Sequence, residues 1–238
     1  MATPITQWSA QRAIRLAYKD AGWIQEGDEP NGEQYADALA RLTDLINMWQ
    51  TQGLKLWLMQ DVKVTLVAGQ SKYSLAPAGN VAMVKPLRVV QGYYIDSNNI
   101  RRPLVVLSRE EWTRLSQIVQ QGQVNSYFID KQQLSLDVYF WLVPDATAVA
   151  GSCHLITQTQ VPGPVSLTDN LAFPVEWFMA LRWGLADELC TGQPDAIVQR
   201  CGQKAAQYRQ ALEDWDVEDA SVTFTPDQRS MYAARSFR

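Results

Sequence analysis

The sequence is poor in the residues that carry most catalytic and metal chemistry. Its only histidine is His154, and its three cysteines, Cys153, Cys190 and Cys201, have no metal-like spacing. A Ser-His-Asp or Cys-His arrangement would have to use His154, yet no nucleophile-elbow sequence accompanies it. Neither a glycine-rich phosphate loop nor a dinucleotide fingerprint is present. We therefore expect no catalytic, cofactor or metal site, and we interpret the cysteines as buried thiols in a reducing cytoplasm.

Long apolar runs and an excess of positive charge are also missing. No segment approaches the ~20 apolar residues that a membrane span needs, and the start, Met-Ala-Thr-Pro, has neither the basic region nor the apolar run of a signal peptide. We therefore expect no membrane contact. The formal net charge is −4, and non-specific nucleic-acid binding depends on Lys and Arg displacing counterions. The composition therefore disfavours a non-specific nucleic-acid binder.

What the sequence does contain is enough apolar material for a sizeable core. The chain has 238 residues, of which 47% are hydrophobic, so it can form one large domain or two interleaved small ones. Nine tryptophans are a large number for this length, and tryptophan is enriched in protein interfaces. The composition therefore favours packed assembly with other chains.

Helical periodicity marks the N-terminal end of the chain. Thr6 can cap a helix that Gly22 ends, and a second helix begins at Asn31 and ends at Gly53. The second helix carries an apolar stripe at helical spacing, formed by Tyr35, Leu39, Leu42, Ile46 and Trp49.

A second helical block lies near the C-terminal end. It starts at Pro174, which suits the first position of a helix, and Gly192 to Pro194 separate it from a last long helix. One face of the first of these helices carries Trp177, Leu181, Gly184, Leu185 and Leu189. The last helix carries Ile197, Cys201, Tyr208, Leu212 and Trp215 at helical spacing.

The pattern between the two helical blocks is strand-like. Alternating residues 62–67 lead through a turn to a return strand that begins at Tyr73. Leu87 to Ile95 and Ile100 to Leu107 form a predicted hairpin, in which Pro103 favours an edge position or a bulge. Further strands are predicted over residues 126–129, 134–143 and 153–159.

One short helix is expected within this strand-rich segment. Ser108 and Glu111 form a capping box that predicts a helix to about Val119. His154 falls in the last predicted strand, where we interpret it as a structural residue that faces away from Cys153.

These patterns predict an α+β fold. Residues 1–60 and 172–218 form a helical bundle, residues 61–171 form an inserted β-rich domain, and residues 219–238 form an extended C-terminal arm. Since the chain leaves the bundle and returns, the bundle closes only when both ends meet. If Trp49 and Trp215 are both core residues, replacing either by alanine should cost about 3–5 kcal/mol.

Three groups of acidic residues and one basic region could carry chemistry, but a structural role explains each of them. Glu110 and Glu111 fit the first turn of a helix, Asp187 and Glu188 fit a solvated helix face, and residues 26–29 fit a surface loop or a weak cation site. The basic residues are Arg101, Arg102, Arg109 and Arg114. We interpret them as a solvated face or a subunit interface, with a nucleic-acid contact as the alternative.

Five segments, taken in order, resemble a known family. They are "AGWIQEGDEPNGEQYADAL", "MWQTQGLKLW", "FWLVPD" (Phe140 to Asp145), "FPVEWFMALRWGLADELC" (Phe173 to Cys190) and "AIVQRCGQKAAQYRQAL". Over residues 6 to about 216 the chain resembles the head-to-tail adaptor proteins of tailed phages. The most similar type is the tail accessory factor, or packaged-DNA stabilisation protein, of short-tailed phages. One departure is Leu142-Val143-Pro144, where the family usually has an earlier proline.

The resemblance implies a structural virion protein and no enzyme. Its copies would form a ring, typically twelve-fold, under the portal protein of a filled head. The ring would continue the DNA channel, let double-stranded DNA pass without specific binding, retain packaged DNA and provide the platform for tail or nozzle proteins. The implied location is the head-tail junction of the virion, reached from the host cytoplasm during assembly.

The resemblance also implies that C-terminal arms grip the portal ring. The arm of this chain is aromatic and basic, which suits a docking segment that needs anchors. The predicted portal-binding residues are Phe224, Arg229, Tyr232, Arg235, Phe237 and Arg238. Two other functions remain as alternatives: a virion-associated cell-wall glycosidase that uses Glu110 and Glu111, and a DNA-binding terminator that plugs the channel.

Overall fold

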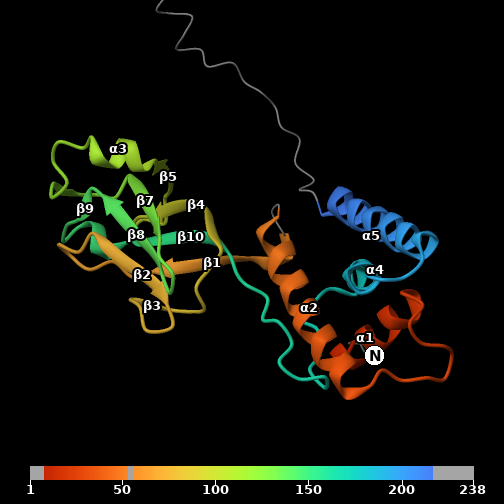
Figure 1. Cartoon of the computed structure of the whole chain (residues 1–238). Helices are drawn as coiled ribbons and strands as arrows, with labels where there is room; N and C mark the ends of the chain where they lie inside the picture. The colour runs from red at the N-terminus through yellow and green to blue at the C-terminus, as the bar shows by residue number, and fades with distance from the viewer. Residues whose placement is uncertain (1–7, 53–55, 217–238) are drawn as a thin grey trace, which may run out of the picture.

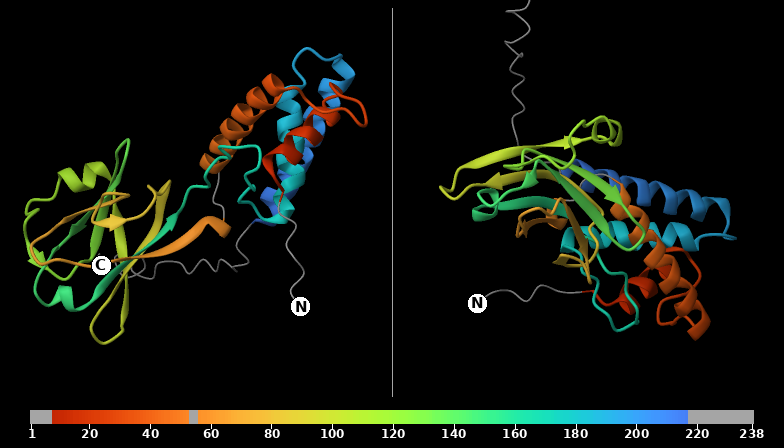
Figure 2. Two further views of the ribbon diagram at one scale, coloured as in Figure 1. Left: turned by 90° about the horizontal axis from the view of Figure 1, so that it is seen from below. Right: turned by 90° about the vertical axis from the view of Figure 1, so that its left-hand side faces the viewer.

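The computed structural model describes residues 8–52 and 56–216 and has an α+β fold. The long helices gather at one end of the molecule, and the strands, together with one short helix, lie at the other end (Figure 1). The same separation is visible from below, in the left view of Figure 2. Two separate clusters of buried residues correspond to these two parts, one among the helices and one within the sheet.

Four helices share the first of these clusters. They are α1 (Ala10–Asp20), α2 (Gly32–Thr51), α4 (Phe178–Leu189) and α5 (Asp195–Trp215). Both chain ends therefore contribute to one core, as the apolar stripes predict. Its largest fully buried side chains are Ile14, Leu42, Ile46 and Leu181.

The start of the first helix differs from the sequence expectation. Helix α1 begins at Ala10, and its cap is Ser9, whose side chain accepts the backbone N–H of Arg12 at 3.3 Å. Ser9 itself has an extended backbone and forms an isolated antiparallel bridge with Asn170. Thr6, the expected cap, lies outside the described residues. Gly22, with φ of 77°, ends the helix as predicted.

The second helix follows its local signals closely. The Asn31 side chain accepts the Gln34 N–H at 2.8 Å, and Gln34 Oε1 accepts the Asn31 N–H at 2.8 Å, which completes the predicted capping box. Helix α2 ends at Thr51, and Gly53 lies outside the described residues. Of the predicted stripe, only Leu39 is partly exposed.

The C-terminal helices confirm one predicted stripe and contradict the end of the other. Pro174 precedes a 3-10 turn, Val175–Trp177, that leads into α4, and all five residues of the first stripe are buried. In α5, however, Trp215 is 65% exposed, so the prediction that it is a core residue was wrong. Helix α5 packs mainly on α4, and Trp215 is its last residue. Among the described residues, the start of α4 therefore covers this side chain only in part.

The second part is a sheet of eight strands in the order β1-β10-β4-β5-β7-β8-β2-β3. The strands are β1 (Met59–Val64), β2 (Lys72–Ala76), β3 (Val81–Ala82), β4 (Arg88–Ile95), β5 (Arg101–Leu107), β7 (Ser126–Lys131), β8 (Leu136–Trp141) and β10 (Ser152–Gln158). Strands β6 (Gln121–Gly122) and β9 (Val143–Pro144) form a separate pair. The predicted strand at residues 134–143 is thus divided between β8 and β9.

The hairpin of β4 and β5 is confirmed, with Gly92 opposite Leu104 and Ile95 opposite Arg101. Pro103 lies in the half of β5 that pairs with β4 alone, because β7 joins β5 only from Val105 onward. The missing N–H of proline therefore interrupts no ladder, in agreement with the predicted edge position.

The return strand that we predicted after β1 does not pair with β1. Strand β2 pairs with β8, so that Tyr73 lies opposite Val138, and its ring contacts Phe140 at 5.4 Å between centroids. Strand β1 pairs instead with β10, which is distant in sequence. Strand β2 therefore pairs with the strand against which its Tyr73 side chain is buried, and not with the strand that directly precedes the short turn.

The short helix is real but shorter than predicted. Helix α3 (Arg109–Thr113) has the full capping box of Ser108 and Glu111. It ends well before Val119, because residues 116–120 have no buried side chain. A helix with no buried face gains little from packing, so the chain turns there toward β6.

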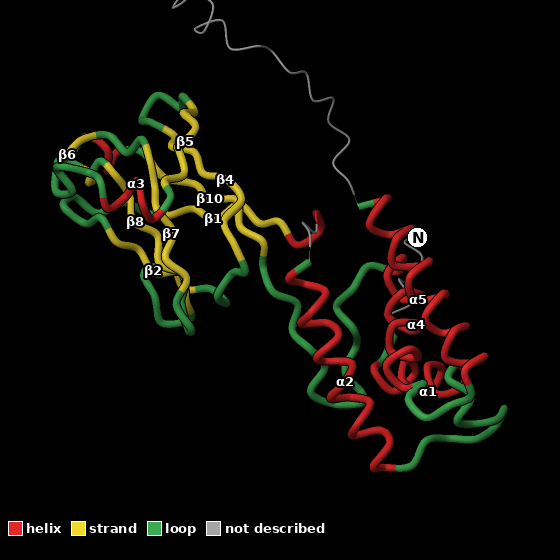
Figure 3. The backbone as a smooth tube through the Cα atoms, turned by 45° about the horizontal axis from the view of Figure 1, so that its top comes forward, coloured by secondary structure: helices red, strands yellow, loops and turns green. Residues whose placement is uncertain are grey.

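Strands β1 and β10, through which the chain enters and leaves the sheet, lie side by side (Figure 3). The chain enters the sheet at Met59 and leaves it at Gln158, and these two residues are paired partners in β1 and β10. The buried Gln50 of α2 holds the returning segment: its Nε2 donates to the Val161 carbonyl at 3.0 Å, and its Oε1 accepts the Val161 N–H at 2.7 Å. Gln158 Nε2 donates to the Gln50 carbonyl at 3.4 Å.

Candidate interaction surfaces

The predicted portal-binding residues lie outside the part of the chain that the structure describes. This applies to Phe224, Arg229, Tyr232, Arg235, Phe237 and Arg238. The role of these six residues in portal binding therefore remains a prediction. Helix α5 ends at Trp215, and the described part of the chain ends one residue later, at Asp216.

The carboxylate pairs have structural roles. Glu111 Oε2 accepts the Ser108 backbone N–H at 2.7 Å, and this hydrogen bond lowers the pKa of Glu111. Glu110 forms an ion pair with Arg114 at 2.5 Å. Asp187 and Glu188 lie on the exposed face of α4, as predicted. A glycosidase needs two carboxyl groups that face one sugar-binding cleft, and Glu110 and Glu111 instead stabilise a helix start.

The acidic turn is anchored to the helical core. Glu29 Oε1 pairs with Arg15 at 2.6 Å, and its Oε2 accepts the Tyr35 hydroxyl at 2.6 Å. The Tyr35 hydrogen bond is the main reason that the pKa of Glu29 is lowered. Within the described ranges, no three His, Cys, Asp or Glu side chains are grouped in a way that could hold a metal ion. We considered residues 26–29 as a surface loop or a weak cation site, and the structure shows an ion pair of Glu29 with Arg15 there.

His154 has partners on every polar atom. Its Nδ1 lies 3.0 Å from Asp61 Oδ1, its Nε2 lies 3.1 Å from the Ser152 hydroxyl, and its ring stacks on Tyr93 at 5.0 Å. Cys153 faces the opposite side of the strand and is fully buried, which raises the pKa of its thiol to about 12. These contacts favour the structural interpretation of His154, since Asp61 and Tyr93 lie on the two strands that flank β10, and Ser152 lies on β10 itself.

The basic region is largely neutralised by its neighbours. Arg102 contacts Asp96 at 3.5 Å and Gln123 at 2.6 Å, and Arg109 pairs with Asp130 at 2.5 Å. The Arg101 guanidinium lies over the Tyr93 ring, 5.0 Å from its centroid. A phosphate would therefore have to compete with existing partners for these side chains. This arrangement favours the structural interpretation over a nucleic-acid contact.

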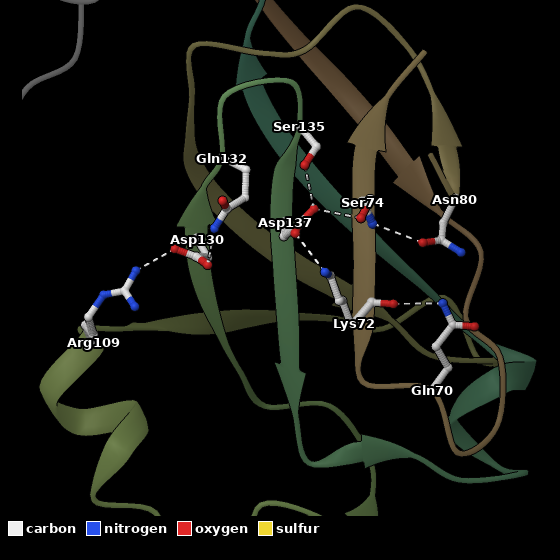
Figure 4. A network of polar contacts seen from close by, with 9 residues as sticks. All are labelled: Gln70, Lys72, Ser74, Asn80, Arg109, Asp130, Gln132, Ser135 and Asp137. Carbon is white, nitrogen blue, oxygen red and sulfur yellow. Dashed lines mark hydrogen bonds and ion pairs between the residues drawn. The ribbon is translucent and has the colours of Figure 1, made fainter. Parts of the chain in front are cut away.

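A polar network on the sheet was not identified from the sequence (Figure 4). At its centre Asp137, 4% exposed, accepts the Ser74 hydroxyl at 2.7 Å and pairs with Lys72 Nζ at 2.9 Å. Ser135 adds a third contact at 3.0 Å. Burial alone would raise the pKa of Asp137, but these hydrogen bonds outweigh it and lower the pKa. The network holds β2 against β8, and the one sequence signal is an aspartate within an apolar strand.

An open, mainly apolar groove lies between α4 and α5, next to Trp215. Its volume is about 350 Å³, and it is lined by Glu176, Met179, Ala180, Tyr208, Ala211, Leu212 and Trp215. Trp215 is 65% exposed and Met179 38%. Large apolar side chains that stay exposed together mark interaction sites in soluble proteins. The groove between α4 and α5 is therefore a candidate binding surface, and it lies at the C-terminal end of α5.

Comparison with known proteins gives one clear match. A family model described as SU10 adaptor protein matches residues 10–230, which include all the helices and strands described above. A search of curated proteins found no match. Among the described residues, no helix is long and apolar enough to cross a bilayer. The family is of a structural, non-enzymatic kind. Because the match covers most of its length, the chain belongs to the SU10 adaptor protein family, a family of phage head-to-tail adaptors.

Proposed function

We propose that copies of this protein form a connector ring that docks under the portal and joins the phage head to the tail. The observation that carries the proposal is the family match over residues 10–230, because it includes both helical ends and the intervening sheet. The ring continues the DNA channel, retains packaged DNA and presents the attachment platform for tail or nozzle proteins. Its place is the head-tail junction, and assembly takes place in the host cytoplasm.

The division of the chain supports a molecule with two kinds of surface. We assign residues 1–60 and 172–218 to a helical bundle and residues 61–171 to an inserted β-rich domain. Two separate buried clusters support this division, and so does the pairing of Met59 with Gln158 at the crossing between them. In the ring, one unit packs against neighbouring copies and the portal while the other is free to meet the tail.

The net charge fits a channel through which DNA slides. Each copy carries −4, so a twelve-fold ring would carry 12 × −4 = −48. Negative charge along the lumen repels phosphates, and the protein then gives DNA no adhesive surface. Specific DNA binding is not part of the proposal. Attachment to the portal is assigned instead to the aromatic and basic residues of the C-terminal arm.

Mass in solution tests the proposal directly. The full chain is measured by light scattering, first alone and then after mixing with the cognate portal ring. We expect a monomer that forms a ring-sized complex only when portal is present. A portal ring from an unrelated phage is the matched control and should leave the mass unchanged. A small species that ignores the cognate portal would contradict the proposal.

A further inference from the structure

The groove between α4 and α5 has an acidic rim as well as an apolar floor. Glu176 lies in its lining. Among the described residues, the Glu176 carboxylate has no hydrogen bond or ion pair, whereas Glu213 on α5 is paired with Arg209 at 3.0 Å. The groove therefore fits a ligand that is apolar along its length and positively charged at its edges.

A segment of this composition belongs to the chain itself. Residues 229–238 contain Met231, Tyr232 and Phe237 as apolar groups and Arg229, Arg235 and Arg238 as charges, with no acidic residue among them. We propose that the groove between α4 and α5 binds residues 229–238 of the same chain. The aromatic side chains fill the apolar floor beside Trp215, and a guanidinium group pairs with Glu176.

Chain connectivity favours the chain's own segment over that of a second copy. The 13 residues from 216 to 228 join α5 to this segment and can extend to roughly 40 Å, which leaves ample length to turn back. A tether of this kind gives an effective concentration on the order of millimolar. A free second copy at micromolar concentration would be outcompeted by about a thousandfold for the same groove.

Self-docking would also regulate assembly, and this consequence rests on the proposed function. The residues assigned to portal binding include Arg229, Tyr232 and Phe237, so a groove that holds them withholds them from the portal. The portal ring must then compete with the groove for the arm. An arm that is covered in the free chain would limit premature contacts between copies.

The test is a disulfide trap in the full-length chain without portal. Ala211 lines the groove and Ala233 lies within the segment, so the pair A211C and A233C places one thiol on each side of the contact. The matched control is A206C with A233C, because Ala206 is exposed on α5 and lies outside the groove lining. After oxidation with diamide, non-reducing electrophoresis separates looped monomers from covalent dimers. The unmodified chain, with its three buried cysteines, is the background.

We expect a looped monomer for the A211C pair, formed at least several times faster than for the A206C pair and at a rate independent of protein concentration. Equal rates for the two pairs would overturn the proposal. Covalent dimers in place of looped monomers would assign the groove to a second copy and would also overturn it. Since no portal is present, these outcomes are independent of whether the chain binds portal.

The acidic rim is tested in the same trap by reversing one charge. E176K should slow loop formation about two- to fivefold, as expected for one exposed ion pair. E188K is the matched control, because Glu188 is exposed on α4, the helix that follows the turn with Glu176, but lies outside the groove. It should leave the rate unchanged. An equal effect of both variants would show a response to net charge and overturn the assignment of the rim.

Discussion

The difference between two tryptophans gives the sharpest test of the helical core. Trp49 of α2 is 6% exposed, and its ring contacts Trp177 at 6.3 Å between centroids. It lies so close to Gly184 that a Cβ placed there would come within 2.9 Å of the indole. Trp49→Ala therefore removes a large side chain from a closely packed site and should cost about 3–5 kcal/mol.

Trp215→Ala is the matched control, since it deletes the same side chain from the same helical part. Trp215 is 65% exposed, and exposed substitutions usually change stability by no more than about 0.5 kcal/mol. For a chain of this size, 1 kcal/mol shifts the melting temperature by about 2–4 °C. Trp49→Ala should therefore lower it by about 6–20 °C, and Trp215→Ala by about 2 °C or less.

The assay is urea and thermal unfolding followed by far-ultraviolet circular dichroism, which reports mainly the helices. The sheet has a separate core, so near-ultraviolet signals are recorded as well, to detect a second transition. Similar losses in the two variants would refute the reasoning, because burial would then not decide the cost. A loss confined to Trp215→Ala would show that residues outside the described part of the chain cover Trp215.

The remaining predictions concern the connection, the sheet and the arm. Gln50→Ala leaves the buried N–H and C=O of Val161 without partners and should cost about 2–3 kcal/mol in urea unfolding, whereas Gln203→Ala, on an exposed part of α5, should cost almost nothing. Asp137 has a pKa below its ordinary value in the folded chain, so its contribution is complete above about pH 4 and is lost as the pH falls through the folded pKa. Asp137→Asn should therefore be less stable at pH 7, and its stability should fall less steeply than that of the unmodified chain below about pH 4. Truncation at Val222 should abolish co-sedimentation with the portal ring, and a truncated chain that binds normally would refute the role of the arm.

Features set by neighbouring residues could be predicted from the sequence. The capping boxes at Asn31 and Ser108 and the glycine that ends α1 each depend on a few consecutive residues, and all three appear as expected. The hairpin of β4 and β5 belongs to the same class, because a short turn fixes its register. Local hydrogen-bonding groups and backbone freedom are sufficient to specify such features.

Features that depend on distant partners could not be predicted. The pairing of β2 with β8 joins Tyr73 to Val138, and nothing near Tyr73 in the sequence indicates that partner. The exposure of Trp215 depends on where α4 begins relative to the end of α5. The spacing of apolar residues along α5 gives no information about that relative position. The Asp137 network requires Lys72 and Asp137 to lie on adjacent strands, so it follows from the same unpredicted pairing.

The chain crosses between the helices and the sheet twice. For an adaptor, two connections fix the orientation of the sheet better than a single connection would. One connecting strand leaves an inserted unit free to rotate about it, whereas two hydrogen-bonded strands resist that rotation. Here Met59 and Gln158 are paired where the chain enters and leaves the sheet, and Gln50 holds the returning strand to α2. A protein that joins one assembly to another must keep its two binding surfaces at a fixed orientation. This paired connection therefore limits rotation of the sheet relative to the helices, which is the mechanical property that such a protein requires.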